Sequence, residues 1–275
     1  MDTEGNPVNA VHGFMAFVWQ LLSRERPLYV GFAFDESKSN GYRHEIYPAY
    51  KANRDPAPES LKYQFALCRE FIRALGIAEF GSPRFEADDL IGSWAQAMRL
   101  QGHPIHIITK DKDLAQLVQE GDLWWEYGQD IQLDCRGIEK KFGVRPDQIA
   151  DLLAIAGDKV DNIPGVPGIG MVTAAKLLQK FNDIDHLLAS VSRIGQSKLR
   201  GARRIQQLIE THQESIKLAR RLTVIQCGDE VRAGTRDLLW RSLDQQKLSA
   251  FLIKLGLRVV DQKRWLSLGN SSDIS

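Results

Sequence analysis

The sequence predicts an α/β fold, in which a mainly parallel sheet with helices on both faces is followed by an all-helical region. Two observations lead to this prediction. In the first half of the chain, short continuous apolar runs at 28–34 and 105–109 alternate with segments of helical periodicity. Such runs are typical of strands that are buried on both faces of a parallel sheet. Beyond Pro146 only the helical periodicity remains, so the βαβα order gives way to helices.

Each helix is expected where apolar residues recur three and four positions apart. In the first half this spacing occurs at 8–22, 61–75 and 86–100. Gly76 suits the end of the second of these helices, because glycine readily adopts the left-handed conformation of a C-cap. A helix is expected to start at 114–118, and an apolar run at 123–127 indicates a further strand.

The second half begins at Pro146, which suits a first helical turn because its missing N–H would have no partner there. Apolar stripes then run over 149–156 and 174–181, and more helix is expected over 199–221. A small closing element is expected within 238–260, ahead of a polar end at 269–273 that has the composition of a disordered tail.

Composition excludes several classes of protein. The 275 residues can bury a proper core, and 43% hydrophobic with 26% charged residues is ordinary for a soluble globular protein. The sequence has no apolar run near the ~20 residues of a membrane span, and its three cysteines form neither a disulfide framework nor a zinc pattern. A cytoplasmic protein without a membrane partner is therefore expected. The net charge of +1 does not indicate nucleic acid, although a basic stretch covers 193–221, which on charge alone is equally a solvated helix face.

Acidic residues gather at the ends of the predicted strands and in loops. They are Asp35, Glu86, Asp88, Asp89, Asp111, Asp113, Asp158 and Asp161. In parallel sheets ligands bind outside the carboxyl ends of the strands, so the acids that follow the strands should lie at one edge. Clustered carboxylates repel each other unless cations lie between them, and Mg²⁺ prefers such oxygen ligands. Individually each acid also fits a turn, a helix cap or a surface charge; together they predict a shared metal site.

A glycine-rich hairpin follows the last acids. Gly165, Gly168 and Gly170 permit a close approach of the backbone, and the N-terminus of the following helix favours an anion. Loops of this kind hold a DNA backbone without reading its bases. A tight connection between two helices is the structural alternative, but the string over 158–170 is long and specific.

At these residues the chain resembles the bacterial 5′-nuclease family, which comprises the 5′–3′ exonuclease domain of DNA polymerase I and its stand-alone, flap-endonuclease-like relatives. The resemblance runs over roughly residues 5–260. Its motifs lie at 34–35, 42–45, 47–54, 84–89, 109–114 and 157–165. It implies a structure-specific 5′–3′ exonuclease or flap endonuclease that hydrolyses DNA phosphodiester bonds with two metal ions, in replication and repair.

The resemblance also implies roles for particular residues. A first metal ion would be served by Glu86, Asp88, Asp89 and Asp111, and a second by Asp113, Asp158 and Asp161, with Asp35 close by and acting through water. The ions would be Mg²⁺, with Mn²⁺ as a substitute. Lys51 and Arg54 would contact the scissile phosphate, and Arg43 would bind DNA in the same helical arch.

The hairpin would be the family's helix–three-turn–helix element, which holds duplex DNA. Its DNA-binding residues would be Gly168, Ile169, Gly170, Met171, Val172 and Thr173. A potassium ion would be surrounded by Ile155, Ala156, Pro164, Val166 and Ile169. The resemblance thus divides the chain into an α/β nuclease domain at 1–145 with its arch at about 36–60, a DNA-binding domain at 146–225, and a closing element with a polar tail at 226–275. The expected partners are DNA with 5′ flaps or 5′ ends and replication and repair proteins, bound by a monomer.

The chain departs from the family at its start. Family members open with a strand, an acid in an Asp-Gly-like turn and a helix, whereas Met1 matches the loop after that unit. We expect that the start codon was assigned too far downstream. The alternative is a catalytically impaired protein that binds branched DNA without cutting it. A second alternative is a nuclease that cuts RNA on a related acidic sheet, against which the DNA-type hairpin argues.

Overall fold

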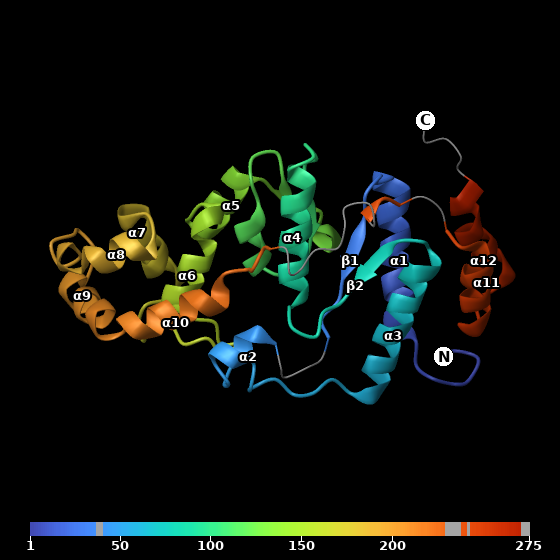
Figure 1. Ribbon diagram of the computed structural model, residues 1–275, viewed down its shortest axis with the longest axis horizontal. Helices are drawn as coiled ribbons and strands as arrows, with labels where there is room; N and C mark the ends of the chain where they lie inside the picture. Colours follow the sequence, from blue (N-terminus) through green and yellow to red (C-terminus); the bar gives the residue numbers. More distant parts are fainter. Residues whose placement is uncertain (37–40, 229–237, 241–242, 271–275) are drawn as a thin grey trace. The chain divides into compact units, whose positions relative to one another are not determined.

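The computed structural model describes residues 1–36, 41–228, 238–240 and 243–270 (Figure 1). The chain divides into two compact units. The first comprises Met1–Phe34, Asp55–Gly81 and Ala233–Ser275, and the second comprises Asp35–Arg54 and Ser82–Arg232. No helix among the described residues is both long and apolar enough to span a membrane.

The first unit is a small parallel sheet with helices packed around an apolar core. Strands β1 (Gly31–Ala33) and β2 (Ala78–Phe80) pair in parallel, with Gly31 opposite Ala78 and Ala33 opposite Phe80. The helices are α1 (Asn9–Glu25), α3 (Glu59–Ala74), α11 (Gln245–Lys254) and α12 (Val259–Leu266). Phe71 is fully buried at the centre. Its ring packs edge-on against Trp265, with 5.0 Å between the ring centroids. Such apolar burial is the main stabilising contribution to this unit.

The second unit contains a three-stranded sheet and most of the helices. Strand β3 (His106–Ile108) pairs in parallel with β4 (Leu123–Glu126), and β5 (Ile131–Leu133) is antiparallel to β4. The helices of the first part of this unit are α2 (Tyr42–Ile46), α4 (Ala87–Arg99) and α5 (Cys135–Phe142). A 3₁₀ turn, Asp113–Leu117, follows β3. Asp111 therefore lies in the loop after a strand of this unit, and Asp88 lies in the first turn of one of its helices.

After β5 the chain is helical, as the sequence predicts. The helices are α6 (Ile149–Ala156), α7 (Met171–Phe181), α8 (Ile184–Ala189), α9 (Ala202–Thr211) and α10 (Gln213–Thr223). A large apolar cluster includes Leu152, Leu177, Ile209 and Ile216, each nearly fully buried. The loop between α6 and α7 carries Asp158, Asp161 and the glycine-rich hairpin, so this packed bundle holds that loop in place (Figure 1).

The α/β class and the helical second part are confirmed, and several details differ from the prediction. Among the described residues the strands form two sheets, and β4–β5 is antiparallel. The turn after β3 is a 3₁₀ helix, and the helix expected over 199–221 is broken at His212, whose backbone φ is −109°. The closing element extends to Leu266, beyond the expected residue 260. Residues 271–275 of the polar tail and 37–40 of the arch lie outside the described residues.

Candidate functional site

All the acids expected to bind metal lie in the second unit. Asp35 accepts the N–H of Ala87 through Oδ1 at 2.7 Å, which places its carboxylate at the N-terminus of α4. Asp88 lies in the first turn of the same helix. Asp111 follows β3, and its Oδ1 accepts the N–H of Asp113 at 3.0 Å. The carboxylates therefore gather from the start of α4 and the end of β3.

Asp88 experiences this crowding most strongly. Burial, followed by the negative charges of Asp111, Asp35 and Glu86, raises the pKa of Asp88 to about 8. A buried carboxyl group whose pKa is raised further by neighbouring carboxylates lies where a divalent cation would be strongly stabilised. The donor set consists of carboxylate oxygens, which suit Mg²⁺.

Asp113 has a similar but weaker perturbation. Burial and the charges of Asp111 and Asp158 raise its pKa to about 6, although Lys112 opposes the shift. Its Oδ1 is buried and accepts no hydrogen bond, while the ammonium of Lys112 lies 3.3 Å away. A buried carboxylate oxygen without a hydrogen bond is costly unless a cation completes its surroundings, so this atom also fits a metal site.

Asp158 and Asp161 lie in the loop after α6. The Oδ1 atom of Asp158 accepts the N–H groups of Val160 at 2.7 Å and Asp161 at 3.3 Å, which closes the turn. Its Oδ2 is 2.6 Å from the ammonium of Lys112. Burial tends to raise the pKa of Asp158, but the hydrogen bond from Lys112 prevails, and the pKa falls below its usual range. Asp158 therefore keeps its negative charge without a metal.

Among the described residues, no three carboxylate, imidazole or thiolate side chains are grouped closely enough to form a ready-made metal site. The acids are close enough to influence one another's charge, as the raised pKa values of Asp88 and Asp113 show. They do not converge on one position where an ion would sit. Mutual repulsion and the intervening basic side chains account for this spacing. The residues fit divalent cations in chemistry and charge, and binding would draw them together.

Asp89 has surroundings that differ from those expected of a metal ligand. Its side chain is fully buried and forms a bidentate pair with Arg43, at 2.8 and 2.9 Å. Its oxygens also accept the N–H groups of Glu86 and Gln226. Four hydrogen bonds satisfy this carboxylate, so in this structure it holds the start of α4 rather than facing a metal.

Arg43 corrects a second expectation. Only 3% of it is exposed, so it is not on a surface that DNA can reach. Its Nε donates to the carbonyl of Leu222, and its Nη atoms donate to Asp89, to Glu86 and to the carbonyl of Val224. All five guanidinium N–H groups therefore have partners. Arg43 connects α2, the start of α4 and the end of α10.

Lys51 and Arg54, which the family resemblance assigns to the scissile phosphate, form ion pairs with acids of the cluster. The Nζ atom of Lys51 lies 2.7 Å from Glu86 and 3.9 Å from Asp161, and Arg54 pairs with Asp161. The backbone of Lys51 is left-handed, with φ +52°, and its N–H donates to the carbonyl of Asp161 at 2.9 Å. The loop therefore fixes the position from which this ammonium extends.

Two residues of the site were missed by the sequence reasoning. Tyr50 is buried, and its hydroxyl lies 3.1 Å from Glu86 and 3.2 Å from Asp161, so it links acids from separate segments. Lys112 lies between Asp113 and Asp158. The signal for Lys112 was present in the sequence, because a lysine between two acids of a predicted metal site has carboxylates on both sides. Tyr50 precedes Lys51 in the 47–54 motif, but nothing in the pattern shows where a phenol points.

The hairpin brings two stretches of backbone into contact. A Cβ added to Gly165 would lie 2.3 Å from the carbonyl carbon of Ala156 and from the nitrogen of Gly157. The carbonyl of Ile155 accepts the N–H of Val166 at 2.8 Å, and Ile169 donates to the carbonyl of Val166 at 2.9 Å. Of the residues expected around potassium, Ile155, Val166 and Ile169 are therefore already joined by backbone hydrogen bonds.

The residues expected to hold DNA run from this hairpin into α7. Gly168 has φ +84°, and the nearest side chain to its open face is Arg204. Gly170 is the N-cap of α7, so the N–H groups at the start of that helix point out of its end. Val172 is 72% exposed and Thr173 is half-buried. This end of α7 therefore presents backbone donors next to a cationic side chain, which suits a phosphate.

We expect Gly165→Ala to destabilise the protein by about 3 kcal/mol or more, because the new methyl group would overlap backbone atoms that cannot rotate away. Urea unfolding measures the change. Gly128→Ala is the matched control: Gly128 is exposed and a Cβ there meets no atom within 4 Å, so its effect should stay within about 0.5 kcal/mol. Equal stabilities for the two variants would show that the contact at Gly165 is not as close as described.

Metal binding is expected to depend on pH. With a pKa of about 8, Asp88 is mostly protonated at neutral pH without metal, and a cation must displace that proton. Affinity for Mg²⁺ should therefore rise up to about tenfold per pH unit below pH 8, with proton release. Because the folded pKa exceeds that of the unfolded chain, the metal-free protein should also lose stability as the pH rises from about 4 to 8.

Titration calorimetry in two buffers of different ionisation enthalpy counts the released protons. Asp88→Asn should retain only the weaker dependence that arises from Asp113, whose pKa is about 6. Metal affinity that stays constant from about pH 6 to 9 would contradict the role given to these two carboxyl groups.

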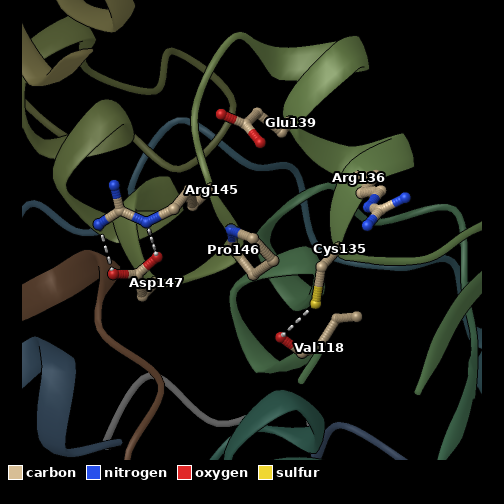
Figure 2. Close-up of a pocket in the computed structure, with 7 residues that line it drawn as sticks. All are labelled: Val118, Cys135, Arg136, Glu139, Arg145, Pro146 and Asp147. Atoms are coloured by element: carbon tan, nitrogen blue, oxygen red, sulfur yellow. Dashed lines mark hydrogen bonds and ion pairs between the residues drawn. The ribbon is translucent and has the colours of Figure 1, made fainter. Parts of the chain in front are cut away.

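A separate cavity of about 230 Å³ opens where the start of α5 meets the segment that leads into α6 (Figure 2). It is lined by Val118, Cys135, Arg136, Glu139, Arg145, Pro146 and Asp147. Arg145 pairs with Asp147 at 2.9 Å, and burial raises the pKa of Cys135 (Figure 2). A thiol with a raised pKa is a poor nucleophile. None of the acids that are expected to bind metal lines this cavity.

Comparisons with known proteins agree with this geometry. Residues 1–143 match the family model described as 5′–3′ exonuclease, N-terminal resolvase-like domain, and residues 144–246 match its C-terminal SAM fold. The 5′–3′ exonuclease of Aquifex aeolicus is 32% identical over 256 residues, which are 93% of this chain and 85% of that protein. DNA polymerase I of Bacillus caldotenax is 35% identical over 261 residues. That match covers 94% of this chain and 29% of the polymerase, so the chain spans less than a third of the polymerase.

Among solved structures, the bacteriophage T5 flap endonuclease in a complex with DNA and metal ions superposes with a TM-score of 0.63. The match covers 94% of this chain and 91% of that one, at 19% sequence identity. At that identity the likeness shows the fold.

Proposed function

We propose a function on the premise that this chain belongs to the 5′–3′ exonuclease family: it is a magnesium-dependent, structure-specific 5′ nuclease that hydrolyses DNA phosphodiester bonds at flaps or 5′ ends. One observation supports this most directly. Burial and the surrounding carboxylates raise the pKa of Asp88 to about 8, while the Lys51 ammonium lies 2.7 Å from Glu86 in the same site. Carboxylates that can bind metal ions, next to the Lys51 ammonium, suit a phosphate held between metal ions.

The acids divide between two ions in this proposal. Glu86, Asp88 and Asp111 would hold the first ion, and Asp113, Asp158 and Asp161 the second, with Asp35 acting through water. When bound, the ions supply an activated water and neutralise charge on the leaving oxygen. Asp89 is assigned a positioning role, because four hydrogen bonds already satisfy its oxygens.

The basic residues then act on the phosphate. The ammonium of Lys51 and the guanidinium of Arg54 reach the carboxylates from one segment. A phosphate bound between the ions would replace these carboxylates as their partner, and both groups would stabilise the negative charge that develops on it. Tyr50, which precedes Lys51, is buried.

DNA would be held away from the reacting atoms by the hairpin. The backbone from Gly168 to Thr173, at the start of α7, would bind phosphates of the duplex without reading sequence. Carbonyl groups of Ile155, Ala156, Pro164, Val166 and Ile169 would hold a potassium ion that stiffens the hairpin. Roles in replication and repair, a cytoplasmic location and a monomeric state belong to the same proposal.

Cleavage of a 5′-flap duplex tests the function. Labelled flap substrate should be cut with Mg²⁺, or with Mn²⁺ in its place, and excess EDTA should abolish cutting. Asp113→Asn should lower the rate sharply while the protein still binds the duplex. A flap of the same sequence in RNA, cut equally well, would favour the alternative of an RNA-cutting nuclease.

A catalytically impaired DNA-binding protein is the second candidate. It is favoured by the absence, among the described residues, of three carboxylates grouped as a ready-made metal site. The same assay separates the two functions. Flap binding that survives EDTA, together with no turnover at any Mg²⁺ concentration, would select the binding protein.

A further inference from the structure

We propose that Lys112 is an internal counter-ion, which occupies the carboxylates of Asp158 and Asp113 until a divalent cation displaces it, and that it thereby sets the metal affinity of the site. This inference rests on the proposed function, because it takes Asp113 and Asp158 as metal ligands. Lys112 itself has no part in the proposed contacts with DNA.

The ammonium of Lys112 lies next to two of the proposed metal ligands. Lys112 Nζ lies 2.6 Å from Asp158 Oδ2 and 3.3 Å from Asp113 Oδ1. The Asp113 oxygen is buried and receives no hydrogen bond, so the nearby positive charge offsets part of the cost of its burial. Lys112 therefore compensates two acids that come from different segments, one after β3 and one after α6.

A metal ion and the Lys112 ammonium would both need Oδ2 of Asp158. Asp158 Oδ1 accepts the N–H groups of Val160 and Asp161, which hold the turn closed. A metal ion bound by Asp158 without opening this turn must use Oδ2, the atom that holds Lys112. A divalent cation and an ammonium on one oxygen repel each other at a separation of about 4 Å. Loading the metal therefore requires Lys112 to leave.

The Lys112 side chain can move away from these carboxylates easily. Its side chain is 41% exposed, whereas that of Asp158 is 8% exposed. The ammonium sits on a flexible four-carbon stem, so it can rotate into solvent while the backbone stays in place. Lys51 and Arg54 occupy Glu86 and Asp161 in the same manner. Only Lys112 can be removed without also removing a proposed phosphate contact.

The experiment compares Mg²⁺ binding to variants of the full chain by titration calorimetry at one pH. Lys112→Gln keeps much of the stem but removes the competing charge, so it should bind Mg²⁺ roughly twofold to fivefold more tightly, the change that corresponds to one partly exposed ion pair. Lys112→Arg keeps the charge and should resemble the unmodified protein. Lys110→Gln is the matched control, since Lys110 is an exposed lysine in the same loop.

A second measurement guards against a folding defect. In EDTA, Lys112→Gln should unfold at a lower temperature than the unmodified protein, and saturating Mg²⁺ should raise its unfolding temperature by a larger interval. Unchanged or weaker Mg²⁺ binding by Lys112→Gln, or equal tightening by Lys110→Gln, would overturn the inference while leaving the proposed function standing. Absence of Mg²⁺ uptake by the unmodified protein would overturn both.

Discussion

Replacing Lys51 with alanine should lower the rate of flap cleavage by about 10²- to 10³-fold, the usual cost of removing one group that stabilises charge in a transition state. The ammonium of Lys51 lies between Glu86 and Asp161, which belong to different proposed ion sites. A phosphate bridging the two ions would therefore meet it directly. The effect should appear in single-turnover rates at saturating enzyme.

The position of this ammonium depends on backbone contacts that the substitution leaves in place. The N–H of residue 51 donates to the carbonyl of Asp161, so Lys51→Ala should keep the local structure and most of the affinity for duplex DNA. Lys159→Ala is the matched control, because it removes an exposed lysine from the neighbouring loop. A Lys51→Ala enzyme that cuts as fast as the control would remove Lys51 from the proposed mechanism.

Replacing Arg43 with methionine should destabilise the protein by about 3–5 kcal/mol, because it leaves a buried carboxylate without its cation. Asp89 is fully buried, and the carbonyls of Leu222 and Val224 would also lose their donor. Urea unfolding in EDTA isolates this effect from metal binding.

Two further variants test whether the loss of stability in Arg43→Met comes from the buried ion pair. Arg84→Met removes an exposed arginine that lies 3.6 Å from the exposed Glu45, and it should change stability by less than about 1 kcal/mol. The double variant Arg43→Met with Asp89→Leu removes both buried charges, so it should recover part of the loss. If Arg43→Met were as stable as Arg84→Met, the buried pair would not have the structural importance given to it here.

Much of the fold follows from the sequence because its signals are local. The periodicity over 86–100 predicts α4 to within one residue, and Gly76 does end α3, with φ +68°. Strands β2 and β5 were not predicted, since three residues without a continuous apolar run give no periodic signal. Helix α5 was missed because Ile138 alone is buried along it.

The acidic cluster was predictable in outline and not in its pairings. The sequence predicts that Asp35, Asp88 and Asp111 lie near each other, and the charges of Asp111 and Asp35 do contribute to the raised pKa of Asp88. The partner of a buried charge depends on contacts between distant segments, which periodicity does not encode. Thus Arg43, expected to face DNA, lies 46 positions from Asp89 and nevertheless pairs with it in the interior. Lys112 reaches Asp158 across the same separation.

The segment 47–54 and the loop 158–162 are joined by reciprocal contacts. Besides the bond from the backbone of Lys51, the Asn162 side chain donates to the carbonyl of Ala49 at 2.6 Å, and Asn53 donates to that of Lys159 at 2.8 Å. Neither stretch keeps its shape from its own sequence alone. A chimera that imports residues 47–54 into a distant homologue must therefore import residues 158–162 with them, because two halves inherited from different parents would lose the fit between them.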